Sequence, residues 1–283
     1  MAIALHLRQW IGRTETTEDV ASAGQIAGLA ALLDYEAPPW RTGEVPPLGH
    51  WLYFLARARQ SEIDADGHPR RGSFLPPITL PRRMWAGSRI VFRTAIEIGA
   101  AMTRRSTIAD IKAKTGASGE MIFVTVRHEI ATASGTVLTE EHDIVFRDAP
   151  RDAQASGAAA AREETQRLCE HARRVTPDPA QLFRFSALTF NAHRIHYDRD
   201  YCRNVEGYPG LLVQGPFTAM LLMDHFLRTR PDALVERFHF RARRPLYDTA
   251  PFDLCFATAS DGADLWALDR QGQVAMVAHV VAT

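Results

Sequence analysis

The sequence lacks an excess of charge of either sign, a long apolar run and any close pairing of cysteines. Its 283 residues carry 33 Lys and Arg against 33 Asp and Glu, so the formal net charge is zero. A chain without a basic excess has no electrostatic footprint for nucleic acid and no polybasic membrane anchor. No run of 18 apolar residues is present, which argues against a membrane-spanning helix.

The three cysteines, Cys169, Cys202 and Cys255, are far apart in the chain. An odd number without a Cys-x-x-Cys pair argues against a disulfide framework and against a zinc ribbon. The N-terminal segment 1–13 has a short apolar start but no small-residue cleavage site. We therefore expect a cytoplasmic protein with neither nucleic acid nor a membrane as its partner.

The composition is that of a globular protein, with 46% apolar and 23% charged residues, and the length suggests one large domain or two small ones. In the first half, helical spacing predicts a helix over 15–34, and the apolar run 50–58 predicts a buried helix. The Pro-, Gly- and Arg-rich segment 61–87 is expected to be a long loop of the kind that often carries function. From 88 to 147, β-rich runs separated by glycines predict an antiparallel sheet.

The second half repeats this order of elements. Alternation predicts a strand over 183–190, the run 211–227 predicts a turn leading into an apolar helix, and three β-rich runs end the chain at 237–246, 252–260 and 274–283. One apolar helix followed by antiparallel strands, present twice, suggests a duplicated sheet wrapped around helices.

The densest polar cluster in an apolar setting comes early in the second half, at Asn191, His193, Arg194, His196 and Asp198. A glycine-marked segment, 207–216, follows and leads into the predicted helix. The free backbone N–H groups and the dipole at a helix N-terminus favour negative charge. The two segments together therefore predict a functional site.

The pattern Asn191-x-x-x-x-His196, followed by Val213-Gln214-Gly215, resembles the hydratase motif of MaoC-like hot-dog enzymes. Those enzymes hydrate enoyl thioesters or dehydrate 3-hydroxyacyl thioesters, and their usual motif, Asp-x-Asn-Pro-Leu-His, supplies a catalytic Asp and His. In this chain Asn191 stands where the Asp is expected. An amide cannot act as a base, but it can hold a water molecule by hydrogen bonds.

Longer segments resemble the type 2 hydroxyacyl-thioester dehydratase branch, which includes mesaconyl-C4-CoA and itaconyl-CoA hydratases. They are FRFSALTFNAHRIHYDRDY and EGYPGLLVQGP in the second half, and PLGHWLYFL, GHPRRGSFLPPITLPRRMWAG and FVTVRHEI in the first. The resemblance implies an α+β double hot-dog, with two antiparallel sheets that each wrap a long central helix. It also implies a degenerate first hot-dog domain at 1–148, a linker at 149–180 and a catalytic hot-dog domain at 181–283.

The resemblance implies that His196 transfers protons, that Asn191 positions water, and that the N–H of Gly215 binds the thioester oxygen. Either His196 carries both protons or another acid such as Asp198 assists. Because Arg recognises phosphate well, we expect arginines to bind CoA, and the candidates are Arg241, Arg243 and Arg244 in the second half and Arg82 and Arg83 in the first.

The pair His193 and His196 has the H-x-x-H spacing of metal ligands, but no HExxH helix or thiolate cluster accompanies it. We therefore expect no metal and no cofactor. Because a double hot-dog already resembles a dimer of single hot-dogs, both a monomer and a homodimer are compatible with the sequence.

Three functions remain open. The first is hydration of an α,β-unsaturated acyl-CoA, with a C5 dicarboxylic substrate (mesaconyl-C4-CoA or itaconyl-CoA, giving citramalyl-CoA) preferred. The second is dehydration of fatty 3-hydroxyacyl thioesters, and the third is acyl-CoA binding without catalysis on the same scaffold. A thioesterase also uses this fold, since fold alone does not fix function. A carboxylate on the acyl group needs an Arg in the acyl pocket, whereas a fatty tail needs an apolar tunnel.

Overall fold

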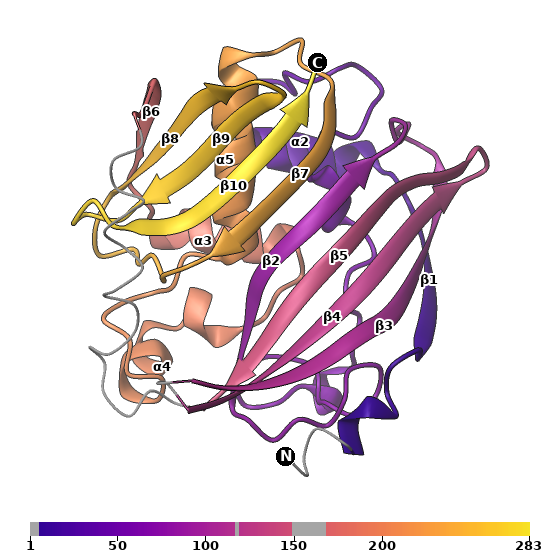
Figure 1. Cartoon of the computed structure of the whole chain (residues 1–283), viewed down its shortest axis with the longest axis vertical. Helices are drawn as coiled ribbons and strands as arrows, with labels where there is room; N and C mark the ends of the chain where they lie inside the picture. Colours follow the sequence, from indigo (N-terminus) through magenta and orange to yellow (C-terminus); the bar gives the residue numbers. More distant parts are fainter. Residues whose placement is uncertain (1–5, 117–118, 149–167) are drawn as a thin grey trace.

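The structure, a computed structural model, describes residues 6–116, 119–148 and 168–283. These residues form one ten-stranded antiparallel sheet with its main helices packed on one face (Figure 1). None of the helices in the described part of the chain has the length and hydropathy needed to span a bilayer.

The first half contributes five strands and few helical residues. Its elements are β1 (Thr14–Val20), α2 (Ala23–Leu32), the 3₁₀ helices η1 (Gly49–Leu52) and η2 (Gln60–Glu62), β2 (Arg82–Phe92), β3 (Ala101–Gly116), β4 (Gly119–Thr132) and β5 (Gly135–Arg147). The strands β3, β4 and β5 are joined by tight turns and form an antiparallel meander.

The second half contributes five strands and longer helices. Its elements are β6 (His171–Val175), α3 (Pro179–Leu188), the 3₁₀ helix η3 (Arg194–His196), α4 (Arg199–Asn204), α5 (Gly215–Thr229), β7 (Val235–Ala242), β8 (Phe252–Ala259), β9 (Gly262–Leu268) and β10 (Val274–Ala282). The helix α5 lies behind β7–β10 in Figure 1, and its buried residues run from Phe217 to Phe226.

The strand order confirms the predicted duplication. Across the sheet the order is β1-β3-β4-β5-β2-β7-β10-β9-β8-β6. In each half the first strand lies at the outer edge, the second at the centre, and the remaining three run from the edge back to the centre. The two halves therefore have the same topology and meet at the pair β2–β7.

The junction between β2 and β7 is tightly packed. Its register pairs Gly87 with Arg241 and Ile90 with Phe238, and the last two side chains are buried on the inner face. A Cβ atom at position 87 would lie 2.3 Å from the backbone oxygen of Phe240. Glycine thus allows the two halves to approach each other closely at this point.

The prediction of a buried helix over 50–58 was wrong, because only the four residues of η1 are helical there. The side chains of His50 and Trp51 instead turn toward Glu140 of β5, and the backbone N–H of Phe54 donates to Asp19. Tertiary contacts thus override the apolar run, and the first half lacks the long central helix that α5 provides in the second.

Three further sequence predictions need correction. Residues 183–190 lie mostly in α3 and not in a strand, because Asp178 accepts hydrogen bonds from the N–H groups of Ala180 and Gln181 and Pro179 occupies the first turn. The predicted helix over 15–34 divides into β1 and α2, and the last residues of the predicted loop 61–87 belong to β2.

The structure pairs Cys169 with Cys255 in a disulfide, which the odd number of cysteines did not suggest. Of the predicted linker 149–180, residues 149–167 lie outside the described residues, and β6 lies in the remainder. The division of the chain into domains at 1–148 and 181–283 stays a prediction.

A buried ion network also links the halves. The carboxylate of Asp224 on α5 is 2% exposed and accepts from Arg173, Arg228 and the hydroxyl of Tyr35 at 2.7–2.9 Å. The guanidinium of Arg228 also donates to the backbone oxygen of Leu33. This network fixes the end of α2 against α5.

We predict that Asp224→Ala lowers the free energy of unfolding by about 2 kcal/mol, because it leaves a buried hydroxyl and two partly exposed guanidinium groups without their acceptor. Tyr35→Phe removes one hydrogen bond only and should cost about 1 kcal/mol. Chemical denaturation of both variants measures these values. An Asp224→Ala variant as stable as the unmodified protein would contradict the role given to this network.

Candidate active site

A cavity of about 1530 Å³ is lined by residues of both halves. The first half contributes η1, the loop that follows it, the start of β2 and the inner faces of β4 and β5. The second half contributes Asn191, His193, His196 and the segment from Leu212 to Pro216. The hydratase-like motif therefore lines a cavity that is present because the first half has the short η1 in place of a long helix.

The side chain of His196 lies on η3 and is 6% exposed. Its Nδ1 is 2.8 Å from the backbone oxygen of Leu212. Because that oxygen can only accept, Nδ1 carries the proton and Nε2 keeps its lone pair. Burial lowers the pKa of His196 to about 4, so the ring is neutral near pH 7 and can act as a base.

Asn191 follows Phe190, which lies just beyond the end of α3 and has a left-handed backbone conformation with a φ of 49°. The Oδ1 atom of Asn191 accepts from the backbone N–H of His193 at 3.0 Å. Its amide NH₂ has no hydrogen-bond partner among the residues that the structure describes, and the residue lines the cavity. The amide can therefore hold water as a donor, while its oxygen shapes the loop.

The first turn of α5 presents Gly215 to the cavity. The first intrahelical acceptor, the oxygen of Gln214, is used by Thr218, so the N–H groups of Gly215 and Phe217 have no partner within the helix. The side chain of Gln214 is buried and donates to the oxygen of Leu182 and to Ser186, both on α3. Gln214 thus fixes the helix start where the resemblance places the thioester oxygen.

Asp198, the alternative proton donor considered from the sequence, does not line the cavity. Its carboxylate pairs with Arg194 at 2.7 Å and accepts from the backbone N–H of Tyr201 as the N-cap of α4. Asp198 therefore has a structural role, which leaves two possibilities: His196 carries both protons, or another acid assists it.

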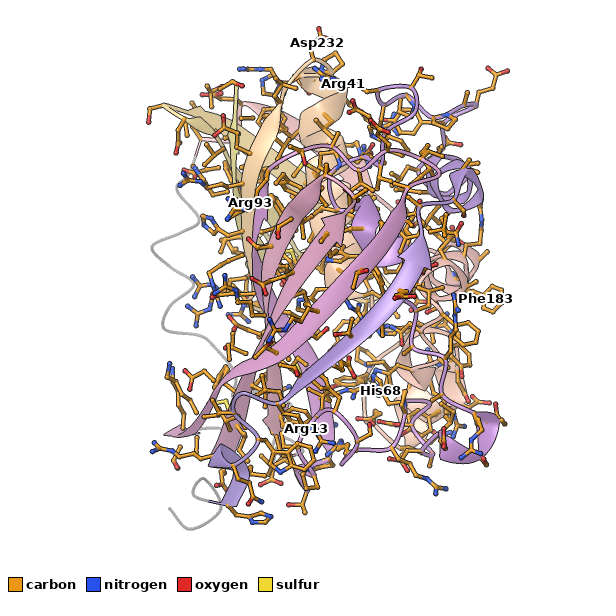
Figure 2. All side chains as sticks on the ribbon, turned by 90° about the vertical axis from the view of Figure 1, so that its right-hand side faces the viewer. Arg13, Arg41, His68, Arg93, Phe183 and Asp232 are labelled. Atoms are coloured by element: carbon orange, nitrogen blue, oxygen red, sulfur yellow. A yellow bond between two sulfur atoms is a disulfide. The ribbon has the colours of Figure 1, made fainter. Side chains whose placement is uncertain are left out.

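Two residues that the sequence did not single out lie beside the motif. His68 comes from the loop after η2, and its ring centre is 4.0 Å from that of His193, which is 5.4 Å from that of His196. The Nδ1 of His68 is 3.0 Å from Oδ2 of Asp66. Figure 2 shows His68 on the helix-bearing side of the sheet. The sequence signals were the length of the loop 61–87 and the family resemblance of the segment that begins at Gly67.

The candidate arginines have different surroundings. Arg82 pairs with Glu206 at 3.3 Å and stacks over Tyr208. Arg243 and Arg244 line the cavity, whereas Arg241 lines a separate hollow on the sheet with Arg89 and Arg237. The structure thus brings four of the five candidate arginines, Arg82, Arg83, Arg243 and Arg244, to the cavity.

Arg83 is the unusual member of this group. Its side chain lines the cavity and makes no hydrogen bond or ion pair with any described residue. Burial lowers its pKa to about 10, with Asp66 acting in the opposite direction, so it is charged near pH 7. A partly buried guanidinium that makes no hydrogen bond or ion pair with a described residue suits an anionic group of a ligand.

A polar belt crosses the inner face of the first-half sheet between two apolar clusters. At its centre is Glu140, which His50 contacts at 3.1 Å and Ser88 at 2.7 Å. Burial raises the pKa of Glu140, but His50 and its neighbours outweigh this effect and hold the pKa below its ordinary value. The belt also includes Arg104, Ser106, His128 and His142.

Comparison with known proteins identifies the same family as the sequence resemblance. A family model described as hydroxyacyl-thioester dehydratase type 2 matches residues 48–248. The chain is 45% identical over 272 residues, 96% of each chain, to a mesaconyl-C(4)-CoA hydratase of Chloroflexus aurantiacus. A solved MaoC-like dehydratase superposes with a TM-score of 0.71 at 12% identity, covering 97% of this chain and 99% of its own.

A Mycobacterium tuberculosis protein described as a double hot-dog superposes with a TM-score of 0.53 at 13% identity over 96% of each chain. Together with the duplicated strand order, this likeness confirms the expected α+β double hot-dog fold. The two sheets are joined into one, and a long central helix is present in the second half only.

We predict that the free energy of unfolding falls as the pH is lowered from 6.5 to 5. Burial lowers the pKa of His196 and His142 to about 4 and that of His128 to about 3. In this range these groups bind protons only after unfolding, and each contributes about 1.4 kcal/mol per pH unit.

Denaturation at several pH values measures this dependence, and His196→Gln should reduce the slope by about one proton. A flat profile in the unmodified protein would contradict the burial of neutral histidines.

Proposed function

The chain belongs to the hydroxyacyl-thioester dehydratase type 2 family of hydro-lyases, and we propose that it hydrates a C5 dicarboxylic enoyl-CoA, mesaconyl-C4-CoA, to citramalyl-CoA. In this substrate the carbon that receives the hydroxyl also carries the free carboxylate. A cation is therefore needed close to the proton-transferring histidines. The unpartnered guanidinium of Arg83 is the observation that carries this choice of substrate.

The site residues of the second half fit the hydration step. The neutral Nε2 of His196 accepts a proton from water, which Asn191 holds through its amide NH₂. Negative charge developing on the thioester oxygen is stabilised by the free N–H of Gly215 and the dipole of α5. A Cβ at 215 would make an ordinary 3.6 Å contact with the oxygen of Trp85.

The charge near the histidines supports a carboxylate on the acyl group. Arg83 acts electrostatically on both His68 and His193, so it lies on the side of the cavity where the β-carbon must be. The polar belt around Glu140 adds buried charged groups to the same cavity. A fatty acyl chain would require apolar walls there, which makes fatty 3-hydroxyacyl dehydration the weaker alternative.

Arginines line other parts of the cavity and suit the phosphates of CoA. Arg243 and Arg244 lie after β7, and Arg82 with its partner Glu206 lies at the start of β2. We assign Arg243 and Arg244 to CoA and Arg82 to the wall that supports them. The cytoplasmic location stays a prediction of the same proposal, and both a monomer and a homodimer are compatible with it.

We predict that His196→Gln lowers kcat for hydration at least ~100-fold, the low end of the effect of a positioned acid or base. The measurement is the steady-state rate on mesaconyl-C4-CoA, with circular dichroism as the control for folding. Turnover equal to that of the unmodified protein would refute the assignment of His196.

The choice of substrate is tested with Arg83→Gln and a panel of mesaconyl-C4-CoA, itaconyl-CoA, crotonyl-CoA and a long-chain enoyl-CoA. We expect kcat/KM for mesaconyl-C4-CoA to fall about 10- to 100-fold, the value of a charge-assisted hydrogen bond. Crotonyl-CoA has no carboxylate and serves as the internal control, because its kcat/KM, measured at the pH optimum of each protein, should fall much less than that for mesaconyl-C4-CoA. An equal loss on both substrates would contradict the proposed role of Arg83.

A further inference from the structure

We propose that His68, held by Asp66, is a second catalytic acid and base, and that the first half of the chain thereby supplies the proton donor that Asn191 cannot provide. The inference rests on the proposed hydration of an enoyl-CoA. It adds to that reaction a residue that lies more than 120 positions before the hydratase-like motif.

The contacts of His68 are those of a carboxylate-supported imidazole. Its Nδ1 is 3.0 Å from Oδ2 of Asp66, and its backbone N–H donates to Oδ1 of the same carboxylate at 2.9 Å. The ring is therefore fixed with Nδ1–H toward the carboxylate, and Nε2 is left for chemistry. A carboxylate in this position orients the ring and stabilises its protonated form.

The position of His68 matches the needs of the reaction. It lines the cavity together with His193 and His196, and the three rings follow one another at centre distances of 4.0 and 5.4 Å. His68 and His196 thus reach one cavity from different halves of the chain.

The loop that carries His68 is fastened to the motif itself. The backbone N–H of Arg194 donates to the backbone oxygen of Asp66 at 2.9 Å, and the guanidinium of Arg194 donates to the backbone oxygen of Ala65. Gly67, which lies between Asp66 and His68, has a φ of +92°, and a Cβ at this position would lie 1.8 Å from the backbone oxygen of Ala192. Only glycine permits this contact, which fixes His68 relative to His196.

The two histidines divide the two proton transfers. Neutral His196 takes a proton from water as the water oxygen bonds to the β-carbon. Protonated His68 gives its Nε2 proton to the α-carbon, where the new C–H bond forms. Each turnover leaves His196 protonated and His68 neutral, and a proton then returns to His68 through His193 or solvent. Dehydration is the reverse sequence.

Charged groups from both halves act on His68. Burial lowers the pKa of His68, the hydrogen bond with Asp66 raises it, and Arg83 and Arg71 lower it, so that the pKa lies below its ordinary value. The groups that face the ring are Asp66 and Arg71 on its own loop, Arg83 on β2, and His193 and His196 from the second half.

The same geometry also has to be weighed as a metal site. Ligand atoms of Asp66, His68 and His193 lie within 4.8 Å of one another. However, both oxygens of Asp66 already accept hydrogen bonds from His68, and the nearby guanidinium of Arg83 places a positive charge beside the cluster. A divalent cation would be repelled there, so the acid–base function is favoured.

The test is the pH dependence of kcat/KM for mesaconyl-C4-CoA and crotonyl-CoA. The reaction needs His196 neutral and His68 protonated, so the profile of the unmodified protein is bell-shaped. His68→Gln should lower kcat at least ~100-fold with little change in KM, and it should abolish the basic limb while the acidic limb remains. His239→Gln, at an exposed position on β7, is the matched control with an unchanged profile.

Asp66→Asn keeps the shape of the side chain and removes its charge. We expect it to shift the basic limb to lower pH and to lower kcat about 10- to 100-fold, as loss of an orienting partner does. This variant retains the ring of His68, so it tests the inference even if His68→Gln is unstable.

A His68→Gln variant with kcat within threefold of the unmodified protein, or one that keeps both limbs, would overturn the inference. So would an Asp66→Asn variant whose basic limb does not move. Loss of activity on chelation, restored by a divalent metal, would replace the inference with a metal site. If the unmodified protein hydrates crotonyl-CoA but not mesaconyl-C4-CoA, only the choice of substrate fails; inactivity on the whole panel refutes the proposed function itself.

Discussion

Backbone hydrogen bonding between β2 and β7 determines where most other parts of the molecule lie. It joins two sheets of five strands at their edges and makes their inner faces continuous. The start of β2 then lies against the start of α5, so that the oxygen of Trp85 would be 3.6 Å from a Cβ at Gly215. The cavity, with walls from both halves, follows from this one pairing.

The inner face of the first-half sheet gives up part of the stability that an apolar core would provide. Three buried nitrogen atoms there, Nδ1 of His50, Nε of Arg104 and Nε2 of His142, have no hydrogen-bond partner within the described part of the chain. Such groups cost free energy when they are buried without hydrogen-bond partners. A cavity that keeps them is suited to a polar ligand, because a ligand that supplies the missing partners recovers that free energy.

The repeated order of elements predicted the duplication, and the family resemblance implied the fold class and identified the motif from Asn191 to Gly215. It did not predict α3, since the alternation of Phe183 and Phe185 fits a strand, while the Asp178–Pro179 cap decides for a helix. The helix expected over 50–58 is reduced to the short η1, in which His50 contacts Glu140, 90 residues away in the chain. His68 was not identified, since its neighbours come from the distant motif.

The short η1 has a consequence for how a ligand can be oriented. Two equal halves would form a cleft with twofold symmetry, and a substrate could lie in it either way round. In this chain the second half brings the first turn of α5 to the cleft, and the first half brings the polar belt around Glu140. Because the two halves now present different groups to the cleft, an unsymmetrical ligand fits it in one orientation only.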